Sequence, residues 1–166
     1  MFCYFNKSYG CQDYSLGRIK AYLRILRILG LDNLDFIGGE PTVRGDILEI
    51  LRYSRKIGFK KVSITTNGFL LGDEDFMKRC VDAGLNHATY SFAGASALIH
   101  DGNTCVNGSF DRLVKAVENS NNLELGFDIH YVILKNNFET VGEVVERFRE
   151  NKPQRFEMIY FTPGFD

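Results

Sequence analysis

The chain has 166 residues, of which 45% are hydrophobic and 25% are charged, and its 20 basic residues are balanced by 21 acidic ones. This composition is typical of a globular protein with one hydrophobic core, and the near-neutral charge argues against a nucleic-acid-binding surface. No apolar run approaches the length of a membrane span, so we expect a cytoplasmic protein that binds neither membranes nor nucleic acid.

Helical periodicity recurs along the chain. Ser15 is a favourable N-cap for the first helix and Gly30 a favourable C-terminal stop. In the second helix, Val43 and Ile47 are expected to face the core. The predicted helices cover residues 15–30, 43–57 and 73–83, and two more begin at Ser109 and Asn137.

Short apolar or alternating runs between these helices predict strands. They cover residues 34–37, 62–65, 87–92, 123–134 and 156–161. Strands that alternate with helices imply a parallel sheet with right-handed crossovers. About five β/α repeats, rather than eight, predict an open, partial (β/α) TIM-type barrel. We expect residues 1–166 to form a single domain, with a loop of about fifteen residues after the strand at 87–92.

A glycine-rich phrase, Gly38-Gly39-Glu40-Pro41-Thr42, follows the strand at 34–37. Two glycines allow the backbone to approach a ligand closely, and a proline is favoured where a helix begins. Ligands of such sheets bind beyond the carboxyl ends of the strands, which is where this phrase lies.

The cysteines and histidines give weaker signals. The four cysteines contain no C-x-x-C pair, which by itself is poor evidence for a metal site. Cys80 is predicted in the core, and Cys105 in the long loop. We expect His87 on the surface and His130 on the barrel interior.

Taken in order, the motifs at the strand ends resemble those of the radical S-adenosylmethionine (SAM) superfamily. In that family a strand end carries C-x-x-x-C-x-aromatic-C, and the following strands end in G-G-E-P, T-N-G and S-L-D-G, with H-D and G-S-F-D further on. The matching segments here are Phe2-Cys3-Tyr4, Gly38–Thr42, Thr66-Asn67-Gly68, Ser91–Gly94, His100-Asp101 and Gly108–Asp111. The resemblance covers essentially the whole chain.

The resemblance implies a [4Fe–4S] cluster and SAM as cofactors, with reductive cleavage of SAM starting radical chemistry on a substrate. Cys3 would be a cluster ligand. Gly38, Gly39 and Glu40, followed by Pro41, would meet the SAM amino group. Thr66 would line the SAM site, and Asn67 and Ser91 would lie near the ribose and the methionine carboxylate.

Two departures from the family pattern bear on activity. The motif's first two cysteines would precede Met1, and Ala93 stands where the family often has Asp. We therefore expect this sequence to represent a fragment of a longer barrel, inactive by itself. The alternative is a non-catalytic relic that binds a nucleotide-like ligand or a protein partner.

The resemblance also implies partners. Besides SAM, the implied partners are an unidentified substrate and an electron donor such as a flavodoxin or ferredoxin. The reaction on the substrate could be the modification of a peptide or a step in cofactor biosynthesis. The His100-Asp101 pair is expected to fix the long loop rather than to transfer protons.

Overall fold

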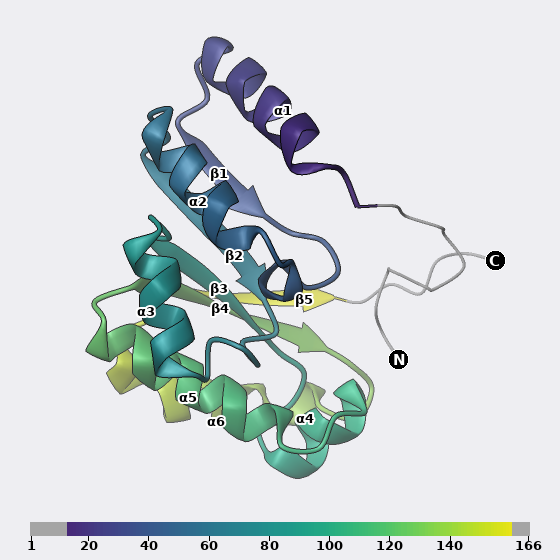
Figure 1. Cartoon of the computed structure of the whole chain (residues 1–166). Coiled ribbons are helices and arrows are strands. Elements are labelled where there is room, and N and C mark those ends of the chain that lie inside the picture. Colours follow the sequence, from purple (N-terminus) through teal and green to yellow (C-terminus); the bar gives the residue numbers. More distant parts are fainter. Residues whose placement is uncertain (1–12, 161–166) are drawn as a thin grey trace, which may run out of the picture.

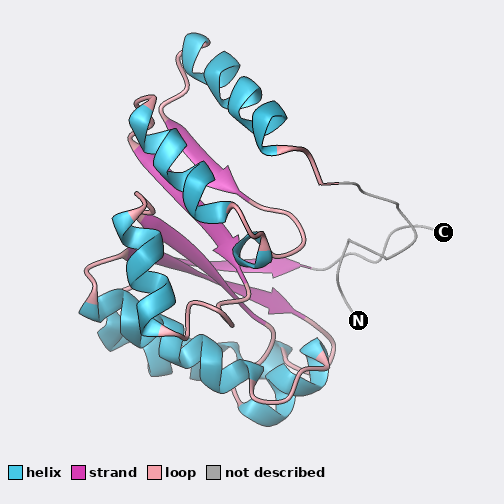
Figure 2. Cartoon of the chain, viewed as in Figure 1, coloured by secondary structure: helices cyan, strands magenta, loops and turns pink. Residues whose placement is uncertain are grey.

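The computed structural model describes residues 13–160, which form one five-stranded sheet. All strand pairs are parallel, and the strands lie in the order in which they follow one another along the chain (Figures 1 and 2). The strands are β1 (Asn33–Phe36), β2 (Lys61–Thr66), β3 (His87–Phe92), β4 (Gly126–Ile133) and β5 (Arg155–Tyr160). The predicted open parallel sheet, a partial barrel, is confirmed.

Helices connect the strands and lie on one side of the sheet (Figure 1). They are α1 (Leu16–Ile28), α2 (Ile47–Lys56), α3 (Glu74–Asp82), α4 (Ala97–Thr104), α5 (Ser109–Asn122) and α6 (Val141–Phe148), with short 3₁₀ turns at Pro41–Val43, Phe138–Thr140 and Arg149–Asn151. Because each crossover is right-handed and the next strand adds on the same side, every helix falls on the same face. We call this the helix-covered face and the other the helix-free face.

Local signals set the helix ends. The Ser15 hydroxyl accepts the backbone N–H of Arg18 at 3.3 Å, and Asp73 accepts that of Phe76 at 2.8 Å at the start of α3. Gly30, just beyond α1, has a φ of +86°, as expected for a glycine that ends a helix. None of the helices in the described part of the chain combines the length and apolar character needed to cross a membrane.

The core lies between the helices and the helix-covered face. Alternate strand residues, including Ile64, Tyr90 and Ile129, are completely buried there. The Tyr90 hydroxyl lies 2.7 Å from the Ser120 hydroxyl of α5, and burial raises the pKa of this tyrosine. Cys80 is in the core as predicted, and burial raises its thiol pKa to about 12.

Several predicted elements differ from the structure. The strand expected from residue 123 begins at Gly126, because α5 and its C-cap extend to Leu123, and the helix expected from Asn137 begins at Val141, after a 3₁₀ turn. The helix expected from residue 43 begins at Ile47, because Pro41 opens a separate 3₁₀ turn, and Val43 is 69% exposed rather than inward. The predicted long loop after β3 contains a helix, α4, that the sequence pattern did not predict. This helix has no side-chain cap hydrogen bond, includes Gly102, and has His100 as its buried side chain, so its periodic signal is weak.

Candidate functional site

The predicted site residues gather at the carboxyl edge of the sheet. Gly38 to Glu40 lie in the loop after β1, and Pro41 begins the 3₁₀ turn that follows. Thr66 ends β2, Asn67 follows it, and Ser91 is the next-to-last residue of β3. These strands are adjacent and parallel, so their ends meet at one edge (Figure 1). Parallel sheets bind ligands at this edge.

The Glu40 carboxylate joins two of these segments. Its Oε1 accepts hydrogen bonds from the Thr42 N–H at 3.0 Å, the Thr42 hydroxyl at 2.6 Å and the Thr66 hydroxyl at 2.7 Å. Its Oε2 accepts the Asn67 N–H at 2.8 Å. Thr42 and Thr66 are buried, so these donors cannot turn to water. The sequence phrase includes Thr42, but its role as a partner of Glu40 is visible only in the structure.

The glycines of the two segments that Glu40 joins differ in how much space surrounds them. Gly38 and Gly39 are exposed, and a Cβ at either position would meet open space, although Gly38 has a φ of +145°. Gly68, after Asn67, has a φ of +73°, and a Cβ there would lie 2.4 Å from the Leu113 side chain. The loop after β1 therefore leaves backbone accessible, while the turn after β2 is packed against α5.

The segment after β3 is held by side chains of α4 and of the loop after β4. The buried His100 accepts the Ala93 N–H through Nδ1 at 3.1 Å, and the Ala93 carbonyl accepts from Asn103 at 2.7 Å and from Asn137 at 2.9 Å. Burial lowers the pKa of His100 to about 4, which keeps the ring neutral and able to accept this bond. The histidine of the H-D pair thus fixes the loop, as expected.

Asp101, the second member of the pair, binds the start of α5. Its carboxylate accepts from the backbone of Gly108 at 2.7 Å and of Phe110 at 2.8 Å, and from the Ser109 hydroxyl at 2.8 Å. Burial raises the pKa of Asp101, but these hydrogen bonds outweigh it, so the pKa is lowered overall. This carboxylate is fully used in holding two helices together.

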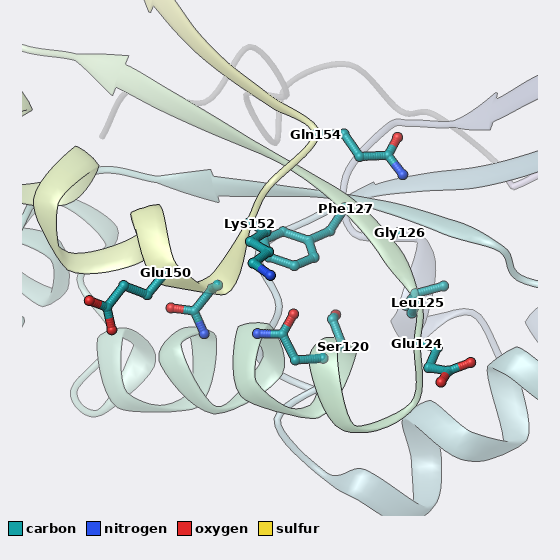
Figure 3. A pocket seen from close by; sticks show the side chains of 10 residues that line it. Ser120, Glu124, Leu125, Gly126, Phe127, Glu150, Lys152 and Gln154 are labelled. Atoms are coloured by element: carbon teal, nitrogen blue, oxygen red, sulfur yellow. The ribbon is translucent and has the colours of Figure 1, made fainter.

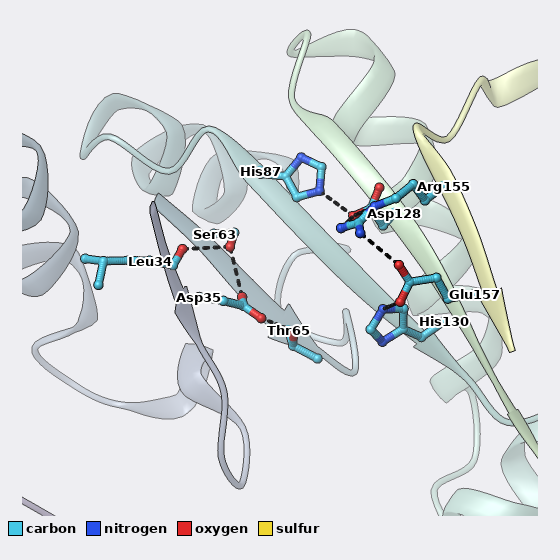
Figure 4. Close-up of polar contacts among 9 residues, drawn as sticks. All are labelled: Leu34, Asp35, Ser63, Thr65, His87, Asp128, His130, Arg155 and Glu157. Atoms are coloured by element: carbon cyan, nitrogen blue, oxygen red, sulfur yellow. Dashed lines mark hydrogen bonds and ion pairs between the residues drawn. The ribbon is translucent and has the colours of Figure 1, made fainter. Parts of the chain in front are cut away.

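The helix-free face carries polar side chains, and the predicted position of one of them, His87, is wrong. His87, expected on the surface, is only 3% exposed, and its Nε2 lies 2.9 Å from the Asp128 carboxylate (Figure 4). Arg155 contacts the same oxygen of Asp128 at 2.7 Å. His87 is buried because it pairs with Gly126 of β4, where the missing side chain leaves room for the ring to pack against β4 beside Asp128. Burial raises the Asp128 pKa, but Arg155 and His87 outweigh it and leave it lowered.

An open hollow of about 360 Å³ lies elsewhere, at the amino ends of β4 and β5 (Figure 3). Ser120, Glu124, Glu150, Lys152 and Gln154 are among the residues that line it. It is at the edge of the sheet opposite the strand ends that carry the motifs. The motif residues and this hollow are therefore separate features.

The predicted cluster ligand, Cys3, lies outside the described residues. Within residues 13–160, no three His, Cys, Asp or Glu side chains are grouped so as to hold a metal ion. Of the two cysteines in this range, Cys80 is buried in the core and Cys105 is exposed just beyond the end of α4.

Comparisons with known proteins agree with this arrangement. The probable GTP 3′,8-cyclase of Saccharolobus islandicus (strain M.14.25 / Kamchatka #1) is 30% identical over 167 residues, which cover 98% of this chain and 52% of the relative. The AdoMet-dependent heme synthase of Methanosarcina barkeri is 28% identical over 144 residues, covering 87% of this chain and 41% of the relative. The chain thus spans about half the length of these relatives.

Solved structures show the same fold. Streptococcus suis SuiB bound to S-adenosylmethionine superposes with a TM-score of 0.76 and 25% identity, covering 98% of this chain and 37% of SuiB. SuiB bound to its precursor peptide SuiA gives a TM-score of 0.77 at 24% identity, covering 97% of this chain and 36% of SuiB. The family model of the radical SAM superfamily matches residues 1–148. On this match, and on the strand-end motifs that the fold brings together, the chain belongs to the radical SAM superfamily.

Proposed function

We propose that the carboxyl edge of the sheet is a SAM-binding site and that the protein is an enzyme that starts radical chemistry by reductive cleavage of SAM. Members of the superfamily are enzymes that use a [4Fe–4S] cluster and SAM. The observation that carries the proposal is the Glu40 carboxylate, which holds the exposed glycine loop beside Asn67.

The residues of this edge fit SAM by their chemistry. Gly38 and Gly39 have exposed backbone facing open space, which suits carbonyl contacts to an ammonium group. The exposed Asn67 and half-buried Ser91 offer polar groups for a ribose or a carboxylate. We assign Glu40, Pro41 and Thr66 to shaping this site, and Cys3 to the cluster, which when bound supplies the electron for SAM cleavage.

The substrate class is the finer part of the proposal. The two relatives named above are a cyclase acting on GTP and a heme synthase by name, which favours biosynthesis of a cofactor. The peptide bound to SuiB keeps peptide modification as the second candidate. In either case we propose a cytoplasmic enzyme that takes its electron from a flavodoxin or ferredoxin.

The first experiment measures SAM binding to the full 166-residue chain by calorimetry. Substituting Asn67→Ala should weaken binding about tenfold, because a hydrogen bond to a charged group of the ligand contributes about 1–2 kcal/mol. Lys152→Ala, at the opposite edge of the sheet, is the matched control and should leave the affinity unchanged. Failure of the unmodified chain to bind SAM would contradict the assigned site.

The second experiment tests catalysis. The sequence contains one cysteine of the three-cysteine motif, Cys3, so we propose that these 166 residues alone do not hold a complete cluster. After anaerobic incubation with iron, sulfide, SAM and a reductant, we expect no 5′-deoxyadenosine. Formation of 5′-deoxyadenosine with a stable cluster would overturn this expectation. SAM binding without cleavage agrees also with the non-catalytic alternative. A variant extended at its N-terminus to supply the motif's other two cysteines distinguishes these hypotheses, because only an enzyme should then cleave SAM.

A further inference from the structure

The helix-free face carries polar side chains where a filled barrel would carry bulky apolar ones. Tyr90 of β3 bonds to α5, so its neighbours in the alternation, Thr89 and Ser91, face the other way. The pairing of His87 with Asp128 places the alternate residues of β4 on this same face. A face of hydroxyls, carboxylates and imidazoles is suited to a polar ligand rather than to apolar packing.

One row of this face runs across three strands just inside the proposed SAM site. The strand register places Ser91 beside His130, and His130 beside Glu157. The His130 Nε2 lies 3.0 Å from the Glu157 carboxylate, and the His130 side chain is 18% exposed (Figure 4). This contact sets the orientation of the ring, and within the described part of the chain Nδ1 has no hydrogen-bond partner.

Glu157 is itself held in place. Its other oxygen, Oε1, lies 2.9 Å from Arg155, which also contacts the buried Asp128. The imidazole is therefore positioned by a carboxylate that is anchored through a guanidinium to the centre of the sheet. Such supporting contacts are typical of side chains that must meet a ligand in a fixed geometry.

The charges near this row indicate the kind of group it would bind. Arg155 already contacts two carboxylates, Asp128 and Glu157, so it is not an uncommitted cation for a phosphate. Elsewhere on the same face, level with His87 in the strand register, the Asp35 carboxylate of β1 accepts from the Thr65 hydroxyl of β2, so the face carries a further negative charge (Figure 4). A polyanionic group would be repelled here, whereas a neutral group with N–H or O–H bonds can pair with imidazole and hydroxyl.

We propose that His130, with Glu157 as the positioning residue, forms a substrate subsite beside the SAM-site residue Ser91, and that this subsite binds a neutral hydroxyl- or amide-bearing group. This inference rests on the proposed function, because it places the substrate next to SAM. Neutral hydroxyl and amide groups occur in nucleosides and in peptides, so the experiment uses one probe of each kind.

The test uses histidine NMR on the full chain, because the sequence has 3 histidines. His87 and His100 are buried and serve as internal controls. With and without SAM, the [¹⁵N]histidine-labelled protein is titrated with guanosine, with a blocked glycine–serine–glycine peptide, or with tripolyphosphate. We expect guanosine or the peptide to shift the His130 ring signals and tripolyphosphate to leave them unchanged.

A variant pair tests the positioning role. Glu157→Gln should weaken the affinity that is measured at His130 about three- to tenfold, because the ring loses the charge that orients it. Glu150→Gln removes an exposed carboxylate at the opposite edge and should have no effect. The ring signals of His130 should also change in Glu157→Gln without ligand, while those of His100 stay in place.

Three results would overturn the inference: no shift of His130 with either neutral probe, a shift with tripolyphosphate only, or equal affinities in the two variants. A protein that fails to bind SAM yet shows the His130 shift in the SAM-free titration would refute the proposed function and leave the subsite standing.

Discussion

The Glu40 carboxylate accepts the backbone N–H of Asn67 at 2.8 Å, which ties the loop after β1 to the turn after β2. The other oxygen is held by buried threonine hydroxyls, so the carboxylate has little freedom to move. Hydrogen bonds to a charged acceptor are stronger than neutral ones, and several on one group fix its position. The glutamate of the G-G-E-P phrase therefore acts in this structure as a connector between two strand ends.

The first prediction concerns this connector. Glu40→Gln places an amide N–H₂ against groups that are themselves donors, so the free energy of unfolding should fall by about 2 kcal/mol and SAM affinity about tenfold. Urea denaturation and calorimetry measure the two effects. Glu49→Gln is the control, because Glu49 makes only an exposed ion pair with Lys20 and should change stability by less than about 0.5 kcal/mol. An equal effect of the two substitutions would contradict the connector role.

The second prediction concerns Gly68. Its positive φ and the short approach of a Cβ to Leu113 make Gly68→Ala doubly unfavourable, so we expect a loss of about 2 kcal/mol or more in stability. Gly17→Ala is the matched control, because Gly17 lies in α1 with open space around its Cβ position. That substitution should stabilise the helix by about 0.5–1 kcal/mol. Thermal unfolding should move in opposite directions for the two variants.

The third prediction is a pH dependence of stability set by His100. Burial lowers its pKa from 6.5 to about 4 in the folded protein, so between these pH values the unfolded chain binds more protons. Stability is fully present above pH 6.5 and should fall by up to about 3 kcal/mol as the pH drops towards 4. Asp101 and Asp128, whose pKa values are lowered, lose their contributions only at still lower pH.

Substituting His100→Asn separates this effect from the other titrations. The amide oxygen can still accept from the Ala93 N–H, but it does not titrate. The free energy of unfolding, measured in urea at several pH values, should become nearly flat between pH 6.5 and 4.5. A slope as steep as that of the unmodified protein would assign the pH dependence to other groups.

The fourth prediction concerns the pair of His87 and Asp128 on the helix-free face. Asp128 is fully buried and contacts both His87 and Arg155, so Asp128→Asn should cost about 3 kcal/mol of stability. Asp82→Asn removes a carboxylate from an exposed pair with Lys78 and should cost less than about 0.5 kcal/mol. Comparable losses in the two variants would show that the buried pair is not a main contributor.

Much of the fold could be predicted because its signals are local. Caps such as Ser15, glycines such as Gly30, and the spacing of apolar residues act within a few positions of one another, so they are readable without the fold. The α4 helix was missed because its main anchor is His100, whose contact with Ala93 depends on how the chain returns after β3. Val43 was misplaced because a 3₁₀ turn shifts the helix start.

The sequence by itself determined the alternation of strands and helices, the family, and the set of residues at the strand ends, since these depend on local pattern and on order along the chain. Only the tertiary structure decided that Glu40 connects two strands, that His87 is buried against Asp128, and that His130 is oriented by Glu157. Each of these contacts joins residues 27 or more positions apart, because neighbouring strands of a parallel sheet are separated in the chain by a whole β/α step. A periodic pattern reports on which face a residue lies, but the partner it meets there is set by strand register and sheet curvature.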